Sequence, residues 1–170
     1  VSLAGLAVTM VTLAVMPAAR IAFGVLTCIG AAMILCGLAQ PLLARLAQHA
    51  AVAGGVCFLL FLVTKHVPDG YIGIAGWTLA ELPSAWYADL VTTFFGLPAP
   101  DFFSADYFPL FPWLFLFAAG FFLYHLLAGR GALRFFVRGH SRLLEWAGRH
   151  SLWIYLLHQP VIAVLLAMAL

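Results

Sequence analysis

Long runs of apolar residues, separated by short polar stretches, make up most of this chain. Five such segments can be counted, at residues 1–16, 21–44, 46–64, 107–128 and 150–170. Each of the last four reaches the length of about 20 residues that a helix needs to cross a bilayer. Because lipid offers no water to backbone groups, we expect helices, and the alternating pattern of a membrane β-barrel is absent. The pattern predicts an all-α fold, a polytopic transmembrane helix bundle with about five spans.

Prolines and glycines indicate where these helices bend or come close to one another. Gln40-Pro41 is expected to bend or end the second segment, and Gly54-Gly55 to allow a close helix contact or a kink in the third. Pro109 and Pro112 are expected to distort the first turns of the fourth segment, for which Ser104 is a candidate N-cap.

Composition supports an integral membrane protein. The chain is 65% hydrophobic and 8% charged, whereas a soluble domain carries about 25% charged residues. Cys28, Cys36 and Cys57 all lie inside apolar segments and lack the spacing of metal ligands, and their odd number argues against a disulfide framework. The chain has no acidic or basic tail, and nothing indicates nucleic-acid binding.

The few charged residues are unevenly divided between two long loops. Residues 129–149 contain five arginines and a single acid, Glu145, whereas residues 65–106 contain five acids and a single base, Lys65. The positive-inside rule therefore places residues 129–149 in the cytoplasm and residues 65–106 outside. Arg20 and Lys65 are exceptions to this rule, because the topology places both of these basic residues outside.

The predicted external loop contains its own helix signal. Residues 83–95 have Pro83 in their first turn and Gly96 after their end, which is typical of a helix. This helix would lay an apolar face on the bilayer surface or on the top of the bundle, through Trp86, Leu90, Val91, Phe94 and Phe95.

The start of the chain is unusual. The first apolar segment is short and ends at Pro17, the first residue is Val1, and no basic stretch of the signal-peptide kind precedes the apolar run. We therefore expect that part of the protein lies upstream, or that translation begins at an unusual codon. On this expectation residues 1–170 are the C-terminal portion of a single transmembrane domain.

Polar residues that could carry chemistry concentrate where the last segment begins. On a helix Ser151, Tyr155 and His158 are spaced i, i+4 and i+7 and share one face. His158 would lie about 12 Å beyond His150, inside a hydrocarbon layer about 30 Å thick. An ionisable group at that depth indicates a functional role, although a neutral histidine bonded to a neighbouring helix explains the same pattern.

Other charged residues lie at the ends of segments. Asp106 opens the fourth segment, either as a functional carboxylate or as an interfacial anchor favoured by the helix dipole. Arg20 precedes the second segment and Lys65-His66 ends the third, where snorkelling to headgroups and an ordinary turn are the plainer interpretations. Trp113 is expected at the membrane interface.

A basic stripe is predicted in the cytoplasmic loop. Arg130, Arg134, Arg138 and Arg142 are spaced by four, so a helix would place them on one side, although Gly131 and Gly139 weaken that helix. Such a stripe suits a phosphate-rich acyl carrier or lipid headgroups, but positive-inside topology alone is the plainer explanation of the same residues. The sequence motifs of serine hydrolases, nucleotide-binding loops and zinc proteases are absent, and no metal is expected.

Three motifs stand out when they are taken together: Phe23–Gly30 (FGVLTCIG), Ser104–Trp113 (SADYFPLFPW) and Gly148–Pro160 (GRHSLWIYLLHQP). In this order they resemble bacterial members of the heparan-alpha-glucosaminide N-acetyltransferase catalytic-domain family. The resemblance implies a multi-pass acyltransferase of the bacterial inner (plasma) membrane. It would take an acetyl or other acyl group from acetyl-CoA or another acyl-CoA and modify an outward-facing amino sugar or glycan. It also implies one or two further N-terminal spans that carry the family's catalytic histidine. Thr27 stands where many relatives have histidine.

Acyl-transfer chemistry, rather than the resemblance itself, suggests roles for the candidate residues. His158 would be a relay or base, Tyr155 a donor, and Asp106 a carboxylate that orients the acceptor. The CoA phosphates would bind basic residues, namely Arg134, Arg138, Arg142 and Arg149. The acceptor would meet Arg20, Lys65, His66 and Trp113.

Two other functions stay open at this point. One is a non-enzymatic transporter or lipid-binding bundle, with His158 lining a pathway, and the other is a helical remnant without activity. The expected partners are the lipid bilayer and a glycan or amino-sugar acceptor, with self-association into a homo-oligomer left open.

Overall fold

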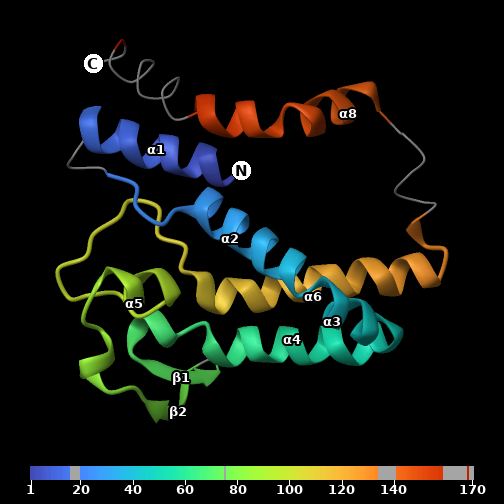
Figure 1. The fold of residues 1–170 in the computed structure, drawn as a ribbon, viewed down its shortest axis with the longest axis horizontal. Helices are drawn as coiled ribbons and strands as arrows, with labels where there is room; N and C mark the ends of the chain where they lie inside the picture. The colour runs from blue at the N-terminus through green and yellow to red at the C-terminus, as the bar shows by residue number, and fades with distance from the viewer. Residues whose placement is uncertain (16–19, 75, 134–140, 159–167, 169–170) are drawn as a thin grey trace. The chain divides into compact units, whose positions relative to one another are not determined.

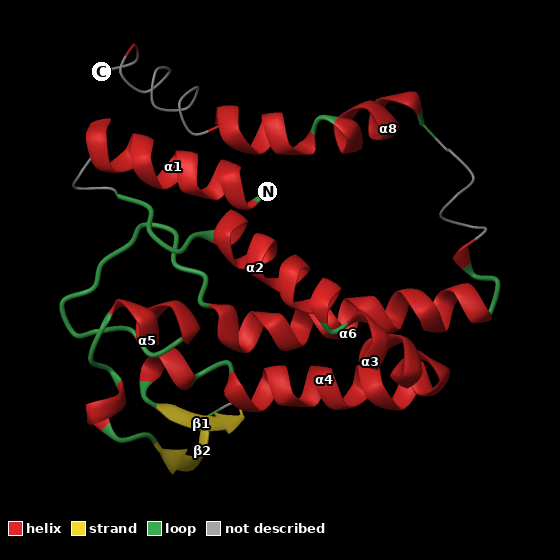
Figure 2. Cartoon of the chain, in the orientation of Figure 1, coloured by secondary structure: helices red, strands yellow, loops and turns green. Residues whose placement is uncertain are grey.

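The structure, a computed structural model, describes all residues except 16–19, 75, 134–140, 159–167 and 169–170. The chain forms two compact units, Val1–Gly129 and Arg130–Leu170. The described part of the first unit has helices α1 (Ser2–Val15), α2 (Val25–Leu38), α3 (Gln40–Leu46), α4 (Ala50–Thr64), α5 (Leu90–Phe95) and α6 (Leu110–Gly129), a hairpin of β1 (Tyr71–Ile74) and β2 (Trp77–Glu81), and the 3₁₀ turns η2 (Ala47–His49), η3 (Val67–Asp69) and η4 (Ser84–Trp86) (Figures 1 and 2). In the second unit the described helices are α8 (Arg142–Arg149) and residues 151–158.

Two stretches of the described chain are long and apolar enough to cross a membrane. They are Gln40–Asp69, with 30 residues, and Leu110–Gly129, with 20. α1 and α2 are apolar but have 14 residues each. The protein is therefore mostly helical, as expected, while a bundle of five spans stays a prediction. The second half of the last predicted segment lies outside the described residues.

The bend predicted at Gln40-Pro41 is confirmed. α2 ends at Leu38, and α3 begins at Gln40 with proline in its first turn. Proline fits a first turn because that position has no helical hydrogen bond to lose, but it cannot continue a helix from the preceding turn. The apolar segment 21–44 is thus divided between two helices.

Small residues allow the helices of the first unit to approach closely. A Cβ at Gly30 of α2 would lie 2.2 Å from Ser2 Oγ of α1, and a Cβ at Gly54 of α4 would lie 3.2 Å from Phe122 Cβ of α6. Phe122 is buried against this contact. The close approach expected of Gly54 is confirmed, whereas a Cβ at Gly55 would meet nothing within 4 Å.

The predicted external loop contains strands, which the all-α prediction did not include. β1 and β2 pair antiparallel, with a register shift between Ile72 and Gly73. A Cβ at Gly73 would lie 2.1 Å from the Trp77 carbonyl oxygen, so this pairing requires glycine. Gly76, with φ of 91°, lies in the turn. The fold class needs this correction: a short hairpin accompanies the helices.

The helix predicted over residues 83–95 is broken in two. Only η4 and α5 form, because Asp89 takes an extended conformation and caps α5 through bonds from Val91 N and Thr92 N. Those backbone donors, Thr92 N first, hold the pKa of the exposed Asp89 carboxyl below its usual range. α5 ends at Gly96, whose φ of 119° suits glycine, as the sequence indicated.

The distortion predicted at the start of the fourth segment is also present. Phe111 has φ −96° and ψ 132°, an extended conformation that steric contact with the following Pro112 favours. Ser104, however, does not cap α6. Its hydroxyl accepts a hydrogen bond from Ala22 N, so this part of the prediction was wrong.

Candidate functional site

Two segments far apart in sequence are joined by hydrogen bonds in the first unit. We call residues 20–25 together with residues 103–109 the loop clasp. Arg20 Nε donates to the Phe103 carbonyl at 3.1 Å, and the Arg20 carbonyl accepts from Ala105 N at 3.0 Å. Phe108 N donates to the Phe23 carbonyl at 2.9 Å. The clasp therefore brings together two of the three motifs identified in the sequence.

Asp106 is the charged residue of the clasp that meets a helix end. Its Oδ2 accepts from Val25 N at 3.3 Å, at the N-terminus of α2, whose own N-cap residue, Gly24, has no side chain to do so. A carboxylate there is favoured by the helix dipole. The anchor interpretation of Asp106 predicted a helix dipole, but the one it meets belongs to α2.

Gly24 leaves space for that carboxylate. A Cβ at this position would lie 2.9 Å from Ile21 Cγ2 and 3.0 Å from Asp106 Oδ2. Gly24 is buried, and the neighbouring Phe23 has a positive φ of 55°. The FG pair of the first motif thus fits the clasp for steric reasons.

A partly buried polar network, which was not predicted from the sequence, connects to the clasp through Tyr107. Thr93 of α5 is fully buried, and its hydroxyl donates to the Asp89 carbonyl at 2.7 Å while accepting from Ala99 N at 2.9 Å. Tyr107 donates its hydroxyl to the Thr93 carbonyl at 2.6 Å. Burial, with a smaller effect of Tyr87, raises the pKa of the Tyr107 phenol, so it stays a hydrogen-bond donor.

An apolar hollow of about 240 Å³ lies beside the clasp. One side consists of α2 residues and the other of residues from Phe108 into α6, namely Val25, Cys28, Ile29, Ala32, Phe108, Trp113, Leu116 and Phe117. Trp113 packs against Phe108 and against Phe61 of α4, with ring centroids 4.9 and 5.4 Å apart. Both motifs therefore line one cavity, whose chemistry suits an apolar group.

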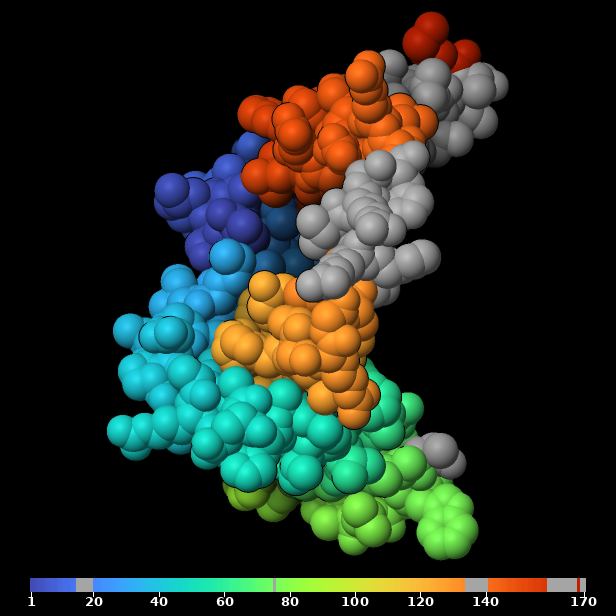
Figure 3. All heavy atoms as spheres, turned by 90° about the vertical axis from the view of Figure 1, so that its right-hand side faces the viewer, coloured from blue at the N-terminus to red at the C-terminus, as the bar shows by residue number. Residues whose placement is uncertain are grey.

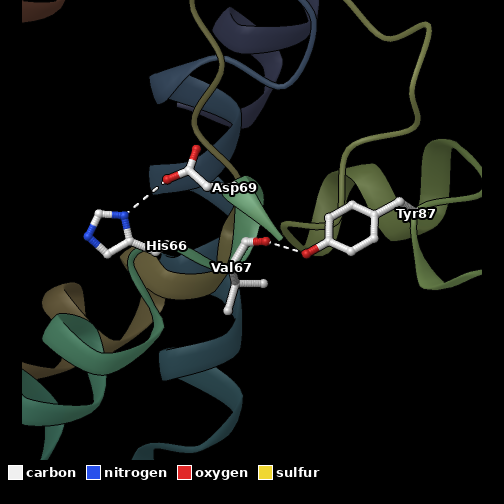
Figure 4. Close-up of polar contacts among 4 residues, drawn as sticks. All are labelled: His66, Val67, Asp69 and Tyr87. Atoms are coloured by element: carbon white, nitrogen blue, oxygen red, sulfur yellow. Dashed lines mark hydrogen bonds and ion pairs between the residues drawn. The ribbon is translucent and has the colours of Figure 1, made fainter. Parts of the chain in front are cut away.

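The end of α4 forms a second polar group. His66 Nδ1 lies 3.0 Å from Asp69 Oδ2 (Figure 4). The imidazole also stacks on Tyr71, with ring centroids 4.8 Å apart. Tyr87 donates its hydroxyl to the Val67 carbonyl in the same corner (Figure 4). Burial and the Asp69 carboxylate raise the pKa of the Tyr87 phenol. Lys65 is exposed beside this group.

The second unit holds the remaining candidates. His158 Nδ1 bonds to the Tyr155 carbonyl, and the two rings have centroids 5.4 Å apart. A carbonyl oxygen only accepts, so Nδ1 carries a hydrogen in this contact. His158 is exposed and Tyr155 half-buried. Arg142 and Arg149 are exposed on α8, whereas Arg134 and Arg138 lie outside the described residues.

The order and content of these motifs agree with a known family. The model described as heparan-alpha-glucosaminide N-acetyltransferase, catalytic, matches residues 1–160. The chain belongs to this family. No curated protein and no solved structure matches the chain. The resemblance inferred from the three motifs is confirmed, and membership of the acetyltransferase family makes the chain an acyltransferase-like membrane protein.

The candidate site residues of this acetyltransferase-family protein lie in three places. Arg20, Asp106 and Trp113 meet around the clasp and its hollow. Lys65 and His66 lie at the end of α4, and Tyr155 and His158 lie in the second unit. The roles given to these residues stay predictions. Thr93 and Tyr107 were missed because hydroxyls in an apolar stretch give no distinctive pattern, although Asp89-x-x-Thr92 is a recognisable capping signal.

Proposed function

We propose that the protein transfers an acyl group, acetyl in the simplest case, from acyl-CoA to an amine or hydroxyl of an amino sugar or glycan. The observation that carries the proposal is the family match over residues 1–160, which includes both motifs that line the hollow. In such a transfer the acceptor attacks the thioester carbonyl, the carbon–sulfur bond breaks, and the acceptor's proton passes to a base while CoA leaves as thiolate.

His158 is the proposed base. Its Nδ1 is held by the Tyr155 carbonyl, which leaves Nε2 as the proton acceptor. A histidine suits this role because imidazole takes up and releases protons near neutral pH. In this proposal Tyr155 donates a hydrogen bond to the developing oxyanion.

The candidates of the first unit are proposed to bind substrate. The apolar hollow at Trp113 suits an alkyl group, and Arg20 and Asp106 are proposed to orient the acceptor at the clasp. Lys65 and His66 extend the acceptor-binding surface. The phosphates of CoA are proposed to bind Arg134 and Arg138 of the loop 129–149, which lies in the cytoplasm of a bacterial cell in this proposal, with the acceptor outside.

An acyl-transfer assay tests this proposal. The protein, expressed from its complete reading frame and placed in proteoliposomes, should move radiolabelled acetyl from acetyl-CoA to a panel of amino sugars and oligosaccharides. His158→Gln keeps a hydrogen-bonding side chain that cannot accept a proton, so turnover should fall by about 10²–10⁴-fold with folded yield unchanged. His49→Gln, at an exposed position before α4, is the matched control and should keep full activity.

Two results would count against it. Full turnover of the His158→Gln variant would remove the base role of His158 while leaving acyl transfer in place. No label transfer to any acceptor by the unaltered protein would overturn the enzymatic function and favour a transporter.

A further inference from the structure

Helix α8 separates apolar from charged side chains along its length. With 100° between successive residues, Leu143, Leu144 and Ala147 share one face. Leu143 is 73% exposed and Leu144 70%, and no residue of α8 is buried. The atoms of α8, orange in Figure 3, are open to view on the face shown. Leaving two large side chains in water costs free energy, so this face requires a cover.

The opposite face of α8 carries charged side chains, which determine what kind of partner is favoured. It holds Arg142, Glu145 and Arg149, a net charge of +1 from two arginines and one glutamate. In sequence the whole loop 129–149 has five arginines and one glutamate, a net charge of +4. A second copy of this loop would bring the same charge and repel the first. An anionic surface is complementary to it.

Trp146 marks the boundary between the two faces. Its side chain is 56% exposed, and its ring stacks on His150 with centroids 4.8 Å apart. Tryptophan is enriched where lipid tails meet headgroups, because its ring is apolar and its N–H is polar. The hydrogen bond from Ile154 N to the His150 carbonyl continues the helical pattern into apolar residues 151–158. The amphipathic helix is thus followed directly by a membrane-type sequence.

We propose that α8 lies along the membrane surface as an interfacial helix that binds anionic phospholipid. In this arrangement Leu143 and Leu144 enter the headgroup–acyl boundary, and the positive charges of Arg142 and Arg149 on the opposite face are attracted to the anionic headgroups within a Debye length. CoA also offers phosphates, but it has no apolar surface large enough to cover two leucines. The proposed cover is therefore lipid, and this inference does not depend on the transferase activity.

Spin-label accessibility in proteoliposomes tests the orientation of α8. Cys28, Cys36 and Cys57 are replaced by alanine, and one nitroxide is attached through Leu143→Cys or, as the matched control, Glu145→Cys. In vesicles of phosphatidylcholine with phosphatidylglycerol, the label at 143 should be accessible to oxygen and protected from a water-soluble nickel chelate. The label at 145 should show the reverse.

Charge variants test the headgroup chemistry. Arg142→Gln and Arg149→Gln should each lower the ratio of immersed to exposed label at 143 by about fivefold in the anionic vesicles. Arg142→Lys and Arg149→Lys keep the charge and should keep the ratio. High salt, or vesicles of phosphatidylcholine alone, should act like the glutamine variants.

Three outcomes would overturn the proposal. One is a label at 143 as accessible to the nickel chelate as the label at 145 in anionic vesicles. Another is protection of the 143 label from both oxygen and the nickel chelate in anionic vesicles, which would show that protein covers the face. The third is protection of that label in detergent by CoA and not by phosphatidylglycerol, which would assign the arginines to CoA.

Discussion

The Thr93 hydroxyl shows how much a single side-chain group contributes to the stability of the fold. It is fully buried, and it satisfies both the Asp89 carbonyl and Ala99 N. Without it, Ala99 N would lose its hydrogen-bond partner, whereas the Asp89 carbonyl would keep the bonds from Thr93 N and Thr92 Oγ1. Among the described residues, every buried side-chain nitrogen and oxygen atom has a hydrogen-bond partner.

Thr93→Val tests this. Valine has nearly the same shape but no hydroxyl, so the free energy of unfolding should fall by about 1–3 kcal/mol, the cost of leaving a buried polar group unpaired. Thr93→Ser keeps the hydroxyl and should cost about 1 kcal/mol for the lost methyl group. Denaturant unfolding in detergent measures both. A valine variant that is no less stable than the serine variant would contradict the assignment.

At the residue scale, sequence reasoning identified important positions better than their partners. It selected Asp106 and Arg20, and the structure shows both in one clasp. It predicted a helix-dipole role for Asp106, but at the helix that follows it in sequence rather than at α2. The reason is physical: which helix end a loop meets depends on tertiary packing, and one sequence carries no direct record of contacts across 81 residues.

Helix α2 likewise has one end that is determined by nearby residues and one that depends on residues far away in the sequence. Its end is determined locally, by Gln40-Pro41, and was predicted. Its start depends on Asp106 and on the space that Gly24 leaves. The hairpin of β1 and β2 was missed because its sequence is short and apolar like the segments around it, and its register depends on Gly73 contacting Trp77.

Two glycines of this region give a matched test. Gly24→Ala would place a Cβ 2.9 Å from Ile21 Cγ2 and 3.2 Å from the Asp106 carbonyl oxygen, and should destabilise the fold by about 1–3 kcal/mol. Gly37→Ala lies within α2 where a Cβ meets nothing within 4 Å, and should stabilise it by about 0.5–1 kcal/mol. Thermal unfolding in detergent compares them. Equal shifts of the same sign would show that the close approach at Gly24 is unimportant.

For the whole molecule, the distribution of charge leads to an orientation. Five acids lie in residues 65–106 and five arginines in residues 129–149, on either side of α6, which is long enough to span. The type of protein and its family were therefore accessible from sequence. The number of spans was harder to predict from the sequence, because residues 21–44 are divided between two helices, α2 and α3.

Reporter fusions test this orientation. A phosphatase fused after Pro100 should be active outside the cytoplasm, and a fluorescent protein fused after Gly139 should fold inside it, because arginine-rich loops resist translocation. Exchanging the two reporters provides the control, since each should then be silent. A silent phosphatase at Pro100 together with an active one at Gly139 would reverse the topology and the assignment of the acceptor to the outer side.

The reach of Asp106 back to Val25 also has a consequence for biogenesis. The two residues are 81 positions apart, so the ribosome must complete the spanning stretch Gln40–Asp69 and the following loop before the cap of α2 exists. Until then Asp106 is not available to accept the hydrogen bond from Val25 N in the first turn of α2. The clasp therefore forms only after residues 103–109 have been synthesised, and it requires them to lie on the same side of the membrane as the start of α2.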